Sequence, residues 1–386
     1  MRFKTQIYSL FLKFHKVRFK DIVIDHHKFL GKNENSITIY DKPPINMILS
    51  PFNVSFDVMD RLLMVNFEED PLYYRIELQV LKIGGEFYPL VIMYRKDDLI
   101  DFYFTNDTAI LTKKKLITNL IKNASFNQLE TIDYKFDFDE MGLKCYLFLK
   151  DKMENEVEIK IKENFPSRKL NSILVPIYAT DKNPQYFPIV YLNKFNMVIK
   201  KDTEIFVKIK EDIKKPSELP VKIENQNYYL ARYSLNPVSC IWNKNYTGNL
   251  NPIMVNVGNI DSIKENLTYE LLNNKGNFEI KKITGIDELN HSLSFEFSPA
   301  IPNLISLKSE IKIKGKFSLI IDNKEGIFAG LYQITKKNEV IQISIHPTKG
   351  WQPFPGKLWL KTYRWIANIE ILDDLEFKIQ SNWTRL

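Results

Sequence analysis

The sequence has few cysteines, few glycines and no long apolar run, and each shortage excludes a class of protein. Only two of its 386 residues are cysteines, Cys145 and Cys240, in separate halves of the chain, so we expect neither a disulfide framework nor a cysteine-based zinc site. No segment reaches the roughly 18 consecutive apolar residues of a membrane-spanning helix. The 13 glycines form no phosphate-binding loop between a strand and a helix, since Gly84-Gly85 belongs to a turn.

Recognisable catalytic and metal motifs are also missing. No two of the five histidines stand at the i, i+4 spacing of helical zinc sites, and the one cluster, His26-His27, would point to opposite faces of a strand. Neither a Gly-x-Ser-x-Gly elbow nor a cysteine nucleophile motif occurs. We therefore expect no metal and no cofactor, and the sequence leaves open whether the protein is an enzyme.

Aromatic residues, in contrast, are abundant at 13%, with 26 Phe and 19 Tyr, and such residues suit a pleated, half-buried surface. From Ile37 onward, short runs of period two alternate with polar turns at the spacing of about 8 to 12 residues that is typical of sandwiches and barrels. We predict strands over 75–80, 88–94, 99–104, 134–138, 143–149, 157–161, 311–321, 326–334, 340–345, 357–359 and 366–371.

Two short segments have helical spacing. Apolar residues at 3, 7, 10, 11, 14 and 17, opposite Arg2, Lys13 and Lys16, predict a basic amphipathic helix that either packs on its own domain or lies on an anionic membrane surface. The residues before Lys20 contain no apolar stretch long enough for a signal peptide, so we expect a cytoplasmic protein, with membrane association through residues 1–20 as an alternative. A second helix is predicted over 113–123.

The length exceeds the roughly 250 to 300 residues at which a single core stops growing, so two domains are expected. The charged segment 210–219 around Pro216 lacks a hydrophobic period and is the best boundary. We predict an N-terminal β domain over 1–212, which includes the leading helix, and a C-terminal β domain over 213–386. The predicted fold class is mainly β, with two antiparallel, lipocalin-like barrels or sandwiches and few peripheral helices.

Glu77 is the first candidate catalytic residue, because it stands in mid-strand between Arg75 and Gln79 on one face. If that face lines a barrel lumen, Arg75 and Glu77 present charge to a ligand, with Tyr94 of the following strand as a further binding residue. An exposed face would instead make them an ordinary surface ion pair.

His346 is the second candidate catalytic residue. It ends the alternating run Val340 to His346 and leads into a proline-stiffened loop with Trp351 and Phe354, where an acid or base group would lie beside an apolar pocket. The alternative is a rigid loop that closes the domain, with Trp351 as its plug.

A third cluster has Tyr229 and Tyr233 on one face of a strand and Tyr228 and Arg232 on the other, residue types that serve ligand anchoring and strand pairing equally well. We include Tyr229, Arg232 and Tyr233 among the candidate binding residues.

Two functions remain open. The first is the binding of an apolar or lipid-like small molecule in a β-barrel lumen, with or without cofactor-free isomerisation, cyclisation or hydration. The second is a non-catalytic interaction protein that docks to a membrane surface or a protein partner. Lysines on surface strands account for the net charge of +7, and no recognisable nucleic-acid-binding motif stands out.

Overall fold

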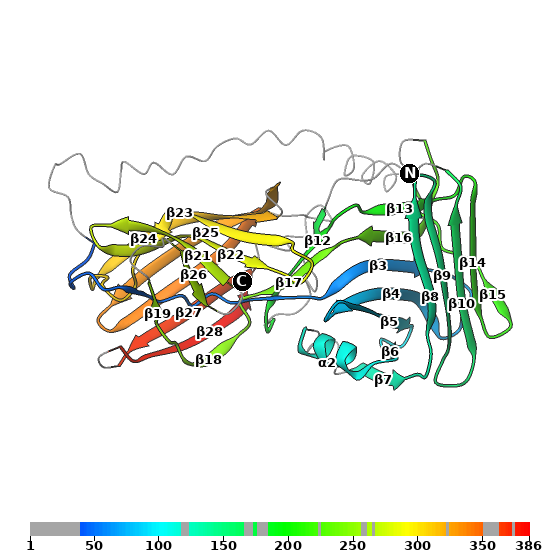
Figure 1. Ribbon diagram of the computed structural model, residues 1–386, viewed down its shortest axis with the longest axis horizontal. Coiled ribbons are helices and arrows are strands. Elements are labelled where there is room, and N and C mark those ends of the chain that lie inside the picture. Colours follow the sequence, from blue (N-terminus) through cyan, green and yellow to red (C-terminus); the bar gives the residue numbers. More distant parts are fainter. Residues whose placement is uncertain are drawn as a thin grey trace.

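The computed structural model describes most of the chain, and this part of it consists mainly of β-strands. The described residues are 39–116, 123–165, 173–175, 184–222, 225–255, 261–264, 267–321, 324–349, 363–372 and 375–386. Strands make up 66% of the structure and helix 3%. The sheets form two lobes that lie side by side along the long axis (Figure 1).

The first lobe is a sandwich of two sheets. Its seven-stranded sheet has the order β13 (Asn196–Ile199), β16 (Tyr228–Leu235), β3 (Met59–Asn66), β4 (Tyr73–Ile83), β5 (Glu86–Arg95), β6 (Ile100–Phe104) and β7 (Ala124–Gln128). Its five-stranded sheet has the order β15 (Asp212–Lys214), β14 (Thr203–Ile209), β10 (Glu156–Glu163), β9 (Gly142–Lys150) and β8 (Asp133–Asp139). Neighbouring strands are antiparallel except β6 and β7, which pair in parallel.

The space between these two sheets is filled by side chains. Strand β10 shows why: in its sequence EVEIKIKE the residues Val157, Ile159 and Ile161 alternate with charged residues, and these three are buried. They join a cluster with fully buried residues of the facing sheet, among them Leu78 and Val91. The interior of this sandwich is therefore a packed core.

The other face of the seven-stranded sheet carries a second apolar cluster, which includes Ile92, Phe102 and residues of α2 (Asp107–Leu116). The side chain of Asn106 accepts a hydrogen bond from the backbone N–H of Thr108 at 2.7 Å and so caps the start of this helix. The predicted start at residue 113 is wrong, because the helix begins six residues earlier; residues 117–122 lie outside the described part.

The second lobe is built on a ten-stranded antiparallel sheet. Its order is β18 (Tyr246–Asn249), β28 (Phe377–Arg385), β27 (Tyr363–Ile371), β26 (Val340–Lys349), β25 (Lys324–Lys337), β24 (Ile311–Ile321), β23 (Ser292–Ile301), β22 (Asn277–Ile286), β21 (Leu267–Asn274) and β20 (Asp261–Lys264). Two smaller sheets accompany it: β11 (Ile173–Val175), β12 (Phe187–Leu192), β17 (Val238–Trp242) and β2 (Val54–Phe56) form one, and β1 (Met47–Ile48) and β19 (Ile253–Met254) the other.

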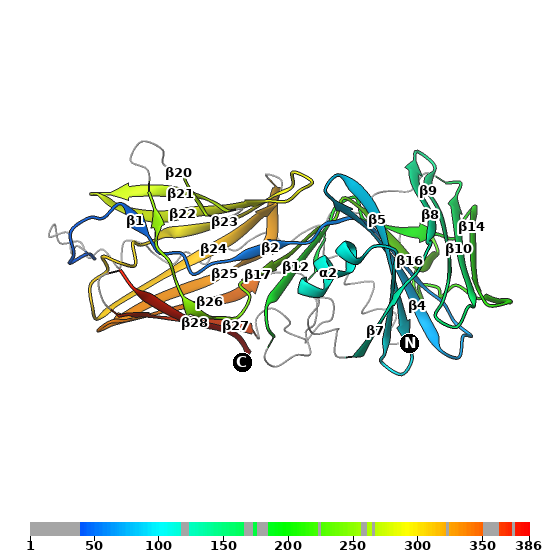
Figure 2. The same ribbon diagram turned by 60° about the horizontal axis from the view of Figure 1, so that its bottom comes forward.

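Aromatic residues fill the core of this lobe. The ring of Trp242 stacks on Phe295 with their centroids 4.4 Å apart, and Trp365 and Trp383 are fully buried in the same cluster. Figure 2 shows β2, β12 and β17 between the ten-stranded sheet and the other lobe. The division of the chain at residue 213 stays a prediction.

The predicted fold class is confirmed at the level of a mainly β protein with several antiparallel sheets. The predicted strands over the described residues are present, and Gly84-Gly85 forms the turn between β4 and β5. Within the described ranges no sheet closes into a barrel. The segments 1–38 and 357–359, with the leading helix and one predicted strand, lie outside those ranges. No helix in the described part is long and apolar enough to cross a membrane.

Candidate ligand-binding site

A row of side chains crosses the whole seven-stranded sheet on the face turned away from the five-stranded sheet. The strand register places the following residues next to one another in turn: Met197, Arg232, Met64, Glu77, Ile92, Phe102 and Phe126. The adjacent row runs through Asn66, Arg75, Tyr94, Ile100 and Ala124. Because residues paired in register share a face, a polar group from β3, β4, β5 and β16 gathers amid apolar neighbours.

Glu77 is the acidic residue of this polar group, and it is only 7% exposed. Its carboxylate accepts a hydrogen bond from the Gln79 amide at 2.5 Å and another from the Tyr94 hydroxyl at 2.9 Å. The burial of Glu77 excludes an ordinary surface ion pair with Arg75. Both carboxylate oxygens are already held by protein donors.

Two arginines lie beside this carboxylate. The Arg75 guanidinium lies over the Tyr94 ring, 3.8 Å from its centroid, and an Arg232 guanidinium nitrogen is 3.4 Å from the Asn66 side-chain oxygen. Neither forms an ion pair within 4.0 Å of a described acidic group, and the Nε atoms of both are buried without a hydrogen-bond acceptor. Burial, and then the like charge of Arg75, lower the pKa of Arg232.

The arrangement leaves one positive charge in excess, since two guanidinium groups lie beside one carboxylate. A buried donor without an acceptor is costly, and buried charges in proteins are normally paired. The two arginines therefore offer hydrogen-bond donors and positive charge for an anion, while the apolar row around them offers contacts for a hydrocarbon chain.

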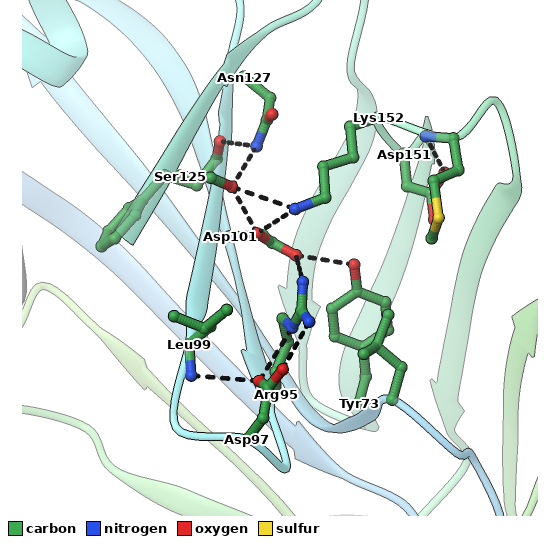
Figure 3. A network of polar contacts seen from close by, with 12 residues as sticks. Tyr73, Arg95, Asp97, Leu99, Asp101, Ser125, Asn127, Asp151 and Lys152 are labelled. Atoms are coloured by element: carbon green, nitrogen blue, oxygen red, sulfur yellow. Dashed lines mark hydrogen bonds and ion pairs between the residues drawn. The ribbon is translucent and has the colours of Figure 1, made fainter. Parts of the chain in front are cut away.

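In the buried network around Asp101 in the same lobe, by contrast, the negative and positive charges are matched (Figure 3). This carboxylate is 1% exposed and accepts hydrogen bonds from Lys152 at 2.8 Å, from Tyr73 at 2.8 Å and from Ser125. Although burial alone would raise the pKa of Asp101, these three donors together lower it. Arg95 lies 3.9 Å away.

We assign the Asp101 network to structure, because its charges are matched and its carboxylate is saturated with donors. Lys152 belongs to the turn between β9 and β10, so its bond ties the five-stranded sheet to β6 and β7. Ser125 and Lys152 both donate to the Asp101 carboxylate, so both are engaged within this network.

Glu163 braces the two sheets at another position. It is 1% exposed and accepts hydrogen bonds from the backbone N–H groups of Leu143 at 2.8 Å and Ile199 at 3.2 Å, and from the Tyr233 hydroxyl at 3.0 Å. A side chain on Gly142, where φ is +114°, would collide with Glu163. Burial raises the pKa of Glu163, and the three donors oppose that shift.

This shift predicts a stability gain on mild acidification. Because the folded-state pKa is raised, the folded protein binds a proton at pH values where the unfolded chain, with a pKa of about 4.3, does not. The free energy of unfolding contributed by Glu163 therefore increases as the pH falls from neutral through the raised pKa. We expect the urea midpoint of the wild type to rise relative to that of Glu163→Gln over this interval; parallel pH profiles of the two proteins would contradict the assignment.

The structure brings together four of the residues proposed from the sequence and separates the others. Arg75, Glu77, Tyr94 and Arg232 share one face, whereas Tyr229 and Tyr233 pack against the sandwich core on the opposite face. His346 lies in the other lobe on β26 (Figure 1), and Trp351 and Phe354 are outside the described residues.

No described acidic side chain forms a hydrogen bond or an ion pair with His346 that could activate it. It lies on the outer face of β26, between the inward-facing Ile345 and Pro347, and its Nδ1 atom is buried without a hydrogen-bond partner. Burial and the like charge of Arg364 lower the pKa of His346.

Asn66 and Gln79 complete the polar group around Glu77, and sequence analysis did not include them among the site residues. The alternation of β4 already predicted that Gln79 lies on the face of Arg75 and Glu77, but not that its amide donates to Glu77. Asn66 had no local signal, because its partner Arg232 is 166 residues away in the chain.

The described residues contain no group of three or more His, Cys, Asp or Glu side chains that could hold a metal ion. The donors of the site are guanidinium, amide and phenol groups, which recognise an anion. Comparison with known proteins adds no assignment: no family model, no curated protein and no solved structure matches the chain.

Proposed function

We propose that the protein binds a lipid-like monocarboxylate on this face of the seven-stranded sheet, with Arg75 and Arg232 holding the carboxylate. The single observation that carries the proposal is the pair of half-buried arginines whose buried Nε atoms lack acceptors beside one carboxylate that is already hydrogen-bonded. A lumen of a closed barrel is not required, because the ligand would lie along a sheet face.

The charge balance favours a carboxylate over a phosphate monoester. Arg75 and Arg232 exceed Glu77 by one positive charge, so a monoanion neutralises the site, whereas a dianion would leave a buried negative charge. Partly exposed methionine and aromatic neighbours, among them Met64 and Phe126, offer apolar surface for the acyl chain. Catalysis is not part of the proposal, since Glu77 has both oxygens occupied.

Calorimetric titration with three ligands of one chain length tests the proposal: oleate, the neutral oleyl alcohol and the dianionic oleyl phosphate. We expect oleate to bind at least about 30-fold more tightly than oleyl alcohol, because the alcohol lacks the charged group that pairs with the two half-buried arginines. Equal affinity for oleate and the alcohol would overturn the role of the arginines. Tighter binding of the phosphate would overturn the assignment to a carboxylate.

A further inference from the structure

The outer face of the ten-stranded sheet carries three rows of side chains that contain no acidic residue. Across β24 to β28 the register gives one row of Lys314, Gln333, Ser344, Ile366 and Asn382 and another of Lys312, Thr335, Gln342, Asn368 and Gln380. The third contains Lys316, Leu331 and His346, with Arg364 and Thr384 beside them. We call these residues the basic strip.

Three cations of the basic strip are not neutralised by any described acidic residue. Lys312 and Lys314 are exposed, and neither they nor Arg364 form an ion pair with any described acidic group. The inward-facing residues of the same strands, such as Phe317 and Ile343, fill the lobe's core. The alternation of β24 therefore fixes its lysines on the outside.

On the outer face of the five-stranded sheet, in contrast, the lysines do have acidic partners. Its lysines alternate with acidic residues and pair with them: Lys135 with Asp137 at 3.1 Å, Lys160 with Glu158 at 2.6 Å, and Lys208 with Glu156 at 3.2 Å. That face also has a groove of about 830 Å³, but most of its positive charge is locally neutralised. The two outer faces thus differ in charge although both are rich in lysine.

We propose that the basic strip docks the protein on an anionic phospholipid surface. A broad sheet face on which Lys312, Lys314 and Arg364 lack an ion pair with any described acidic residue complements the negative potential of such a membrane. Each lysine or arginine near an anionic surface adds a similar increment of attraction. Leu331, 39% exposed, lies among the cations and can contact the headgroup region.

The strip lacks what a nucleic acid would need. None of its side chains is Phe, Tyr or Trp, so it offers no stacking platform for unpaired bases. Its neutral members are amides and hydroxyls, which suit phosphate and glycerol oxygens. Docking at a membrane would also bring the proposed carboxylate site of the other lobe near a source of lipid, although this inference rests only on the strip itself.

Flotation of the full-length protein with phosphatidylcholine vesicles, prepared with or without phosphatidylserine, tests the proposal. We expect binding only to the phosphatidylserine vesicles and a decrease at high salt. The triple variant Lys312→Gln, Lys314→Gln, Arg364→Gln should partition about 100-fold more weakly, at about fivefold for each lost charge. Its thermal midpoint serves as the folding check, because the two lysines are exposed and none of the three side chains has an ion pair in the described structure.

The matched control changes the net charge equally on the other sheet, with Lys135→Gln, Lys144→Gln and Lys160→Gln. This variant should keep most of its vesicle binding. The proposal fails if the wild type does not bind the anionic vesicles, if both triple variants lose binding equally, or if neither does. Stronger binding to single-stranded RNA than to vesicles, lost in the strip variant, would replace the membrane with a nucleic acid.

Discussion

Replacing Asp101 with alanine is expected to lower the free energy of unfolding by about 3 to 5 kcal/mol, the typical cost of removing one partner from a buried ion pair. The substitution leaves Lys152 without its anion and removes the acceptor for the Tyr73 and Ser125 hydroxyls. It also releases the turn between β9 and β10 from β6. Urea unfolding followed by fluorescence measures the change.

The matched control is Asp97→Ala. Asp97 pairs with Arg95 at 2.6 Å, but its side chain is 48% exposed, so solvent replaces the lost contact and the change should be much smaller. Similar losses for the two variants would show that the Asp101 network is not the brace that its burial indicates.

The same network predicts an acid dependence opposite to that of Glu163. Because the folded-state pKa of Asp101 is lowered, its contribution to stability is fully present above the unfolded value of about 3.9 and is lost as the pH falls through the lower folded value. The difference in stability between the wild type and Asp101→Asn should therefore shrink only below about pH 4.

Local patterns predicted much of the fold because strand alternation is visible in sequence. The Gly84-Gly85 turn pairs Ile83 with Glu86, and this register alone places Arg75 opposite Tyr94. Half of the candidate site therefore follows from one hairpin. The same alternation in β24 places its lysines on the outer face of the second lobe.

The parts of the fold and of the candidate site that sequence patterns did not predict depend on contacts between distant segments of the chain. Strand β16 pairs with β3 across more than 160 residues, and no local pattern indicates that Arg232 lies beside Met64 and the Glu77 row. The prediction of an enclosed lumen was drawn from aromatic content and strand spacing, which a filled sandwich shares with a barrel. Helix α2 was placed too late because its first turn is fixed by the Asn106 cap rather than by apolar periodicity.

Arg232→Met should separate the proposed ligand site from a structural role. Without Arg232, Arg75 and Glu77 are balanced and no like charges repel, so we expect the free energy of unfolding without ligand to rise by about 1 kcal/mol. Oleate binding should weaken at least about 30-fold, because a guanidinium that pairs with the carboxylate is lost. Replacing an arginine with a purely structural role should instead lower the free energy of unfolding and leave the affinity for oleate unchanged.

Arg61→Met is the control for an arginine with a structural role. Arg61 lies on the neighbouring strand and donates to the Asp60 carboxylate at 3.1 Å and to the Phe136 carbonyl at 2.5 Å, so that it links the two sheets. Its replacement should lower stability and leave oleate affinity unchanged. If Arg232→Met instead lowers stability and retains full oleate affinity, Arg232 is a structural residue, and the excess charge beside Glu77 is compensated within the protein rather than by a ligand.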